Sequence, residues 1–187
     1  MSLFDCPLYT IRRKFALGTK FTLTATTGEI IGFCHQKAFK LKEDIRIYTD
    51  ESKSTELVNI QAQQVIDFSA KYDVKTPQDD KNWGVWQRKG LSSIVRDTWE
   101  YTSPDGEVMT LEEDSMGMAL LRRFLSNLIP QSFALKSGNE VIAEFHQHFN
   151  PFIFKMDVKL ISPKAQDIAP AIAAGAILLC AIEGRQQ

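Results

Sequence analysis

The chain has 187 residues, of which 44% are hydrophobic and 24% are charged. These are ordinary values for one globular domain, and they argue against a disordered chain. Lysine and arginine number 22 against 23 aspartate and glutamate residues, so the net charge is −1. A nucleic-acid-binding domain usually carries a large positive excess, and we therefore expect no nucleic-acid partner.

The N-terminus and the cysteines predict the compartment. Residues Met1–Pro7 contain no basic stretch followed by an apolar one, so no secretory signal is expected. Cys6, Cys34 and Cys180 are odd in number and match neither a zinc-binding spacing nor a CxxC pair. Free thiols are typical of a reducing cytoplasm, so we expect a cytoplasmic protein. No sequence motif points to a cofactor, and none is expected.

Apolar and polar residues alternate with a period of two through most of the chain, which is typical of β-strands. Turn residues interrupt the alternation at Thr26–Gly28 and, most clearly, at Ser103–Gly106. Many short strands at regular spacing predict a sandwich or a closed barrel. About eleven strands are expected: Tyr9–Phe15, Phe21–Ala25, Ile30–Gln36, Ile45–Thr49, Leu57–Gln63, Val65–Tyr72, Trp83–Lys89, Asp97–Tyr101, Val108–Glu112, Glu140–Gln147 and Phe152–Leu160.

The first strands contain an internal repeat of 24 residues, which reads as a repeated β-hairpin module. A hairpin cannot bury its apolar face alone, so such modules must pair side by side. The matching positions are Phe15-x-Leu17 with Phe39-x-Leu41, Phe21-x-Leu23 with Ile45-x-Ile47, Thr26 with Asp50, and Phe33 with Leu57.

Two segments depart from the β pattern. Met116–Ile129 has apolar residues at the three- and four-residue spacing of an amphipathic helix, and Pro130 ends it. We expect a helical insertion at about 115–129 that packs over one end of the barrel.

The second segment, Ile168–Ile182, has no charged side chain and is apolar on every side. A helix of this kind is buried in a core or in a membrane. At 1.5 Å per residue it spans about 22 Å, which is short of the roughly 30 Å of a bilayer core. Its slim first half and bulky second half predict a tapering plug inside a barrel, and a tail anchor is the alternative.

These features resemble one family. Repeated Phe-x-Leu hairpins, the late segment Phe149–Lys155 and an apolar C-terminal helix are similar to those of the LURP-one-related proteins, over about Tyr9 to Ile182. That family belongs with the phospholipid scramblases and the Tubby C-terminal domain. The resemblance implies a barrel of about twelve strands around a central hydrophobic helix. Tubby domains bind phosphoinositide head groups through basic residues, but their positions do not match this sequence one by one.

Basic residues on the repeated modules are candidates for lipid binding: Arg12, Arg13, Lys14, Lys37, Lys40 and Lys42, and Lys20 lies on the same modules. Each lysine or arginine near an acidic membrane surface contributes about 1 kcal/mol to binding. The alternative is that these residues only keep the faces and edges of strands in solution.

His146-x-His148 is the sharpest local pattern. In a strand both rings lie on one face, which is an arrangement of metal ligands in β-barrels. A cupin-like site would add a glutamate shortly afterwards, whereas Phe149–Ile153 contains no carboxylate. We therefore expect no metal at this pair.

Together these patterns predict a single mainly β domain over residues 1–187, a closed antiparallel barrel around a buried helix at about 168–182. We expect no enzymatic activity and no catalytic residue. The expected function is a binding or scaffold module that contacts anionic phospholipid head groups or a protein partner, as a cytoplasmic or peripheral membrane protein without a transmembrane span. The alternative is a metal-dependent β-barrel enzyme that uses His146 and His148.

Overall fold

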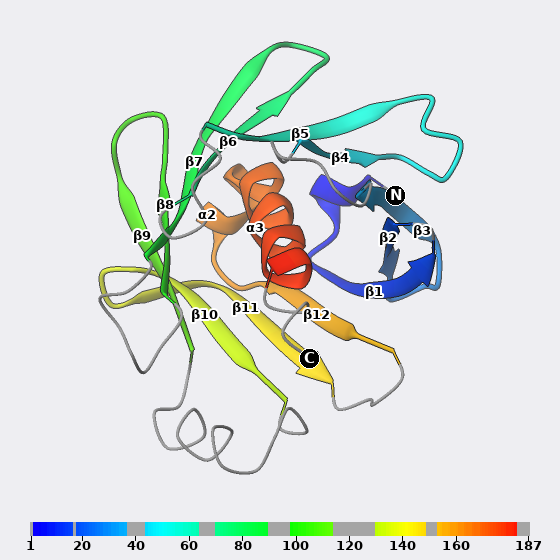
Figure 1. Ribbon diagram of the computed structural model, residues 1–187. Coiled ribbons are helices and arrows are strands. Elements are labelled where there is room, and N and C mark those ends of the chain that lie inside the picture. The colour runs from blue at the N-terminus through cyan, green and yellow to red at the C-terminus, as the bar shows by residue number, and fades with distance from the viewer. Residues whose placement is uncertain are drawn as a thin grey trace.

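The computed structural model describes residues 2–16, 18–36, 44–63, 70–89, 98–113, 130–148 and 153–182. Twelve antiparallel strands close into a barrel, and a C-terminal helix lies inside it (Figure 1). This architecture confirms the predicted fold class. The strands are β1 (Leu8–Ala16), β2 (Gly18–Ala25), β3 (Ile30–Gln36), β4 (Asp44–Tyr48), β5 (Glu56–Ala62), β6 (Lys71–Thr76), β7 (Lys81–Lys89), β8 (Thr98–Thr102), β9 (Val108–Glu113), β10 (Ser132–Ser137), β11 (Glu140–His148) and β12 (Lys155–Leu160).

Each strand pairs with the next one along the chain, and the barrel closes where β1 pairs with β12. At that closure Tyr9 lies opposite Val158, and Ile11 lies opposite Met156. All four side chains are buried. The alternation seen in the sequence therefore places one apolar face of each strand inside the barrel.

The structure corrects the predicted strands at two places. The strand expected at Val65–Tyr72 overlaps β6, at Lys71–Thr76, whose buried residues are Tyr72, Val74 and Thr76, while residues 65–69 lie outside the described ranges. The expected set also lacked β10. That strand buries three consecutive residues, Phe133–Leu135, and has an irregular register after Leu135, so it does not show a period of two.

The repeated hairpins are confirmed in part. Phe21 and Leu23 on β2, and Ile45 and Ile47 on β4, all face the interior and are almost completely buried. The Phe39-x-Leu41 part of the repeat and the helix expected at about 115–129 lie outside the described residues.

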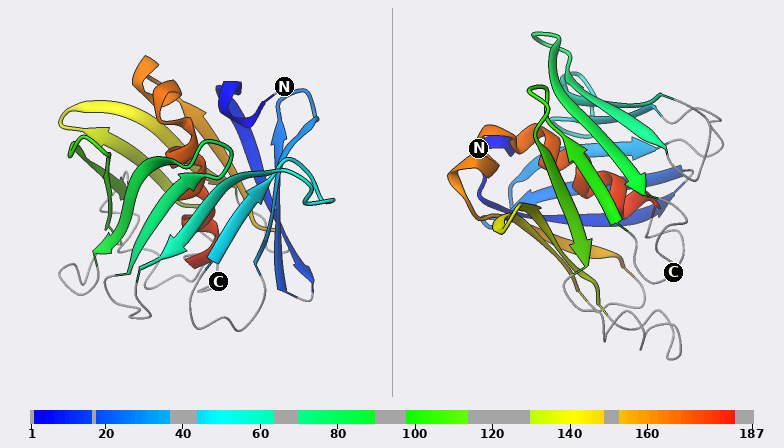
Figure 2. Two further views of the ribbon diagram at one scale, coloured as in Figure 1. Left: turned by 90° about the horizontal axis from the view of Figure 1, so that it is seen from above. Right: turned by 90° about the vertical axis from the view of Figure 1, so that its left-hand side faces the viewer.

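Helix α3 (Ala169–Ile182) fills the barrel, and every residue from Ala169 to Ala181 is buried (Figures 1 and 2). It follows directly on the short helix α2 (Pro163–Asp167), which begins with a proline. The 3₁₀ helix η1 (Leu3–Asp5) precedes β1. The strands thus surround a helix that is apolar on every side and bury its surface, as predicted.

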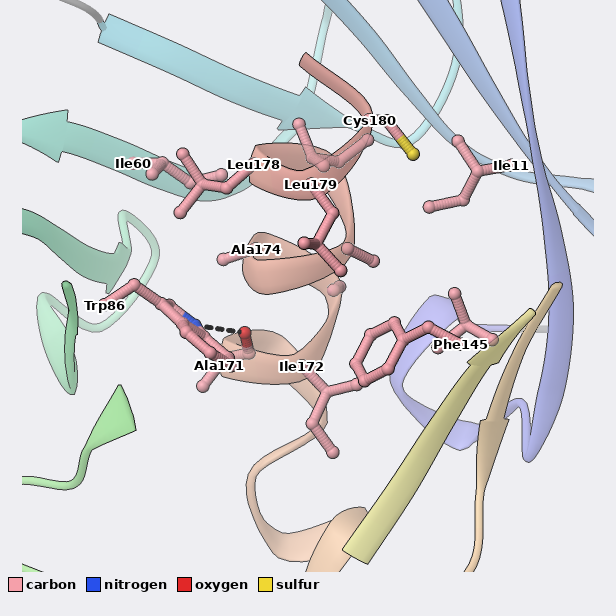
Figure 3. Close-up of a cluster of buried hydrophobic side chains, with 14 of the residues drawn as sticks. Ile11, Ile60, Trp86, Phe145, Ala171, Ile172, Ala174, Leu178, Leu179 and Cys180 are labelled. Carbon is pink, nitrogen blue, oxygen red and sulfur yellow. Dashed lines mark hydrogen bonds between the residues drawn. The ribbon is translucent and has the colours of Figure 1, made fainter. Parts of the chain in front are cut away.

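Trp86 on β7 defines how close α3 approaches the barrel wall. Its indole Nε1 donates a hydrogen bond of 2.8 Å to the carbonyl oxygen of Ala171 (Figure 3). A Cβ atom at Gly175 would lie 2.4 Å from Cζ2 of the same indole. The Trp86 ring therefore occupies the space beside Gly175, and only glycine leaves room for it.

Candidate functional site: a basic row on the outside of the barrel

Four basic side chains lie side by side on the outer face of β12, β1 and β2, and we call them the basic row. Since Tyr9 and Ile11 of β1 face the interior, the alternation of the strand turns Arg12 and Lys14 outward. The register places Arg12 directly opposite Lys155, and Lys14 directly opposite Lys20. The basic row is therefore Arg12, Lys14, Lys20 and Lys155.

The two cross-strand pairs in the basic row bring like charges together. Side chains directly opposite each other in an antiparallel pair have Cβ atoms about 4.5–5.5 Å apart, and like charges there are destabilising. Lys20 is neutralised by Glu51, with 2.6 Å between Nζ and Oε1. Within the described residues, Arg12, Lys14 and Lys155 form no ion pair with a carboxylate. Three of the four cations in the row thus lack an ion pair within the described part of the chain, in a protein whose net charge is −1.

An apolar side chain adjoins the basic row. Ile153 is 48% exposed and lies two residues before Lys155. Its neighbour Phe154 accepts a 3.0 Å hydrogen bond at its carbonyl oxygen from the backbone N–H of Arg13 on β1. A large exposed apolar residue beside several cations is typical of surfaces that contact the membrane interface.

The lipid-binding residues expected from the sequence are distributed as follows. Arg12 and Lys14 are exposed members of the basic row. Arg13 lies between them in the chain but points into the barrel, where it is 7% exposed, so it is separated from that surface. Lys37, Lys40 and Lys42 lie outside the described residues, in the segment that joins β3 to β4.

The sequence did not single out Lys155 as a partner of Arg12. Arg12 lies on the first strand and Lys155 on the last, and only closure of the barrel brings them together. A sign was present in the alternation of β12, where buried Met156 and Val158 imply that Lys155 faces outward. The strand that it would meet could not be inferred from β12 alone.

The two histidines lie on the outer face of β11, as the spacing predicted, with ring centroids 5.4 Å apart. Contrary to the expectation drawn from Phe149–Ile153, a carboxylate is present: Asp157, on β12, has Oδ2 2.6 Å from Nε2 of His148. His146 instead has Nδ1 2.8 Å from the hydroxyl of Ser132.

The two histidines therefore have different partners, Ser132 for His146 and Asp157 for His148. Among the described residues, no group of three or more histidine, cysteine, aspartate or glutamate side chains is placed to hold a metal ion. Partial burial raises the pKa of Asp157, but hydrogen bonds from Thr10 and His148 outweigh it, so the pKa lies below its usual value. Asp157 is therefore an ionised acceptor that links β1, β11 and β12.

The cysteine side chains are unsuited to nucleophilic chemistry. Cys6, Cys34 and Cys180 are all buried. Burial raises the pKa of Cys34 to about 12 and raises the pKa of Cys180 as well. Because the thiolate is the nucleophile, both groups stay protonated and inert near neutral pH.

Comparisons of the chain with protein-family models, with curated proteins and with solved structures found no match. In the described ranges, no helix combines the length and the hydropathy needed to cross a lipid bilayer.

Proposed function

We propose that this protein is a non-enzymatic binding module of the LURP-one-related type, and that its basic row contacts the anionic head groups of a membrane from the cytoplasmic side. The observation that carries the proposal is the pairing of like charges, Arg12 with Lys155 and Lys14 with Lys20. Such pairs weaken a sheet, so their presence side by side needs a reason other than stability. An anionic partner supplies that reason.

The energetics favour a membrane surface. Each lysine or arginine held near an acidic leaflet contributes about 1 kcal/mol, and the attraction weakens within a Debye length as salt is added. Arg12, Lys14 and Lys155 together would contribute about 3 kcal/mol. Burial of the exposed Ile153 in the interface adds an apolar term that salt does not screen.

The experiment is a vesicle flotation assay. Phosphatidylcholine vesicles that carry phosphatidylinositol bisphosphate should bind the protein, and vesicles of phosphatidylcholine alone should bind it much less. Substitution of Arg12, Lys14 and Lys155 by alanine should weaken binding roughly a hundredfold, which corresponds to about 3 kcal/mol.

A matched control separates the basic row from the net charge of the protein. The control variant replaces three lysines on other sides of the barrel by alanine: Lys71 and Lys75 on β6 and Lys136 on β10. It removes the same number of positive charges as the variant of the basic row. This control variant should bind as the wild-type protein does. Equal, negligible binding of the wild-type protein to both kinds of vesicle at low salt would refute the proposed function.

A further inference from the structure

The turn between β4 and β5 carries an acidic residue, Glu51, whose side chain reaches Lys20 of the basic row. The carboxylate of Glu51 lies 2.6 Å from Nζ of Lys20, and its side chain is 69% exposed. The hydrogen bond and charge of Lys20, with the charges of Lys14 and Lys53, hold the pKa of Glu51 below its usual value. Three ammonium groups on three separate segments of the chain thus act on one carboxylate.

Lys53 is held in place by more than its charge. Its φ angle of 60° lies in the left-handed region, which costs about 1–2 kcal/mol for a residue other than glycine. Its Nζ lies 2.9 Å from Nδ1 of His35 and 6.0 Å from the ring centroid of Phe33.

Lys20 reaches the same ring, with Nζ 5.9 Å from its centroid. Phe33 faces outward on β3 yet is only 3% exposed. The two lysines and the ring therefore form one packed cluster and are not independent surface chains.

We propose that Lys14, Lys20 and Lys53 form a subsite for a phosphate monoester, and that the carboxylate of Glu51 occupies this subsite as an internal counterion until a phosphate displaces it. The inference rests on the proposed function, because it names the part of the surface that would receive the head group. A carboxylate and a phosphate are both anions that accept hydrogen bonds from ammonium groups, and a phosphate monoester carries the larger charge. Displacement breaks the Lys20–Glu51 ion pair and transfers no atoms.

The test compares Glu51→Gln with the wild-type protein. Glutamine keeps the size of the side chain and removes the competing charge. With inositol trisphosphate as a soluble probe in titration calorimetry, Glu51→Gln should bind roughly fivefold more tightly, as expected for loss of one charge about 4 Å away in a watery environment. Glu140→Gln, at an exposed site on β11, removes the same charge elsewhere and should leave the affinity unchanged.

Lys53→Gly provides the opposite change. Glycine suits the positive φ angle, so the turn should keep its conformation while the ammonium group is lost. Binding of inositol trisphosphate should weaken by roughly fivefold. A cooperative thermal transition near the wild-type temperature would show that the barrel of each variant is intact.

The outcomes separate this inference from the proposed function. If Glu51→Gln and Glu140→Gln bind inositol trisphosphate equally, Glu51 does not occupy a phosphate site, even if vesicles bind through Arg12 and Lys155. If neither the wild-type protein nor Glu51→Gln binds the soluble probe, the subsite is refuted. If Glu51→Gln binds the soluble probe and the wild-type protein does not, the subsite is supported, even in the case that the wild-type protein fails to bind vesicles.

Discussion

The interior around α3 and the outer face of β12, β1 and β2 are formed in part by the same strands but follow different rules. On β1, Tyr9 and Ile11 face inward and are buried, whereas Arg12 and Lys14 face outward. Every inward contact near α3 removes apolar surface from water, which stabilises the fold. The outward pairs Arg12–Lys155 and Lys14–Lys20 place like charges together, which weakens it.

The stability of the fold therefore explains the buried residues around α3 but not the cations on the outer face. The barrel needs its plug, because twelve strands enclose more space than their own side chains fill. It does not need four cations in a row on its surface. The interior therefore accounts for folding, and binding is the role that we propose for the basic row.

The largest effect is expected for a charge inside the barrel. Leu178 is fully buried in α3, and Leu178→Asp would bury an unpaired carboxylate, at a cost comparable to the whole stability of about 5–15 kcal/mol. We expect loss of the cooperative thermal transition. Ile161→Asp, at a site that is 41% exposed, is the control and should unfold close to the wild-type temperature.

Deletion of α3 should have the same consequence. The four large aliphatic residues Ile172, Ile177, Leu178 and Leu179 are buried and contribute about 6–12 kcal/mol as an upper bound. The chain 1–167 should therefore be insoluble or unfolded by circular dichroism. A cooperative transition of this fragment near that of the full chain would show that α3 is dispensable.

A smaller effect is expected where Trp86 meets α3. Gly175→Ala places a Cβ atom 2.4 Å from the indole, and we expect a loss of about 1–3 kcal/mol in the free energy of unfolding by urea. In a Trp86→Leu background the clash is absent, so the same substitution should cost much less. Equal costs in both backgrounds would mean that the ring does not limit the packing of the helix.

A weaker and pH-dependent contribution is expected at the rim, where Glu107 accepts hydrogen bonds from Lys164 of α2 and from Ser137. These bonds hold the pKa of Glu107 below its ordinary value of 4.5. A depressed pKa stabilises the folded state above the unfolded pKa, and that stabilisation is lost as pH falls through the folded pKa.

Glu107→Gln should therefore lower the melting temperature by about 1–2 °C near neutral pH and by less in acid. Differential scanning calorimetry across pH measures the difference between the two proteins. A difference that grows as the pH is lowered would contradict this explanation.

The two regions also differ in how far the sequence predicts them. Inward residues such as Phe21 and Leu23 follow a period of two, and the charge-free segment Ile168–Ile182 predicts a buried helix, because burial leaves a local record in the sequence. β10 escaped prediction since its three consecutive buried residues leave no such period.

Contacts between distant segments have no local record. The Arg12–Lys155 pair and the Thr10–Asp157 hydrogen bond depend on closure between β1 and β12, and the Trp86–Gly175 contact depends on where the helix enters the barrel. The sequence therefore indicated Arg12, Lys14 and Lys20 but not Lys155. Arg13, adjacent in the chain, was assigned to the site although the same alternation turns it inward.

The most direct test of the division between interior and surface uses one variant and two readouts. Arg12→Thr with Lys155→Thr removes a like-charge pair from β1 and β12 and introduces residues that favour strands. We expect the free energy of unfolding to stay the same or to rise by up to about 0.5 kcal/mol. Binding to vesicles that carry phosphatidylinositol bisphosphate should weaken roughly thirtyfold, the equivalent of about 2 kcal/mol. A variant that is less stable but binds as the wild-type protein does would show that the basic row serves the fold and not a ligand.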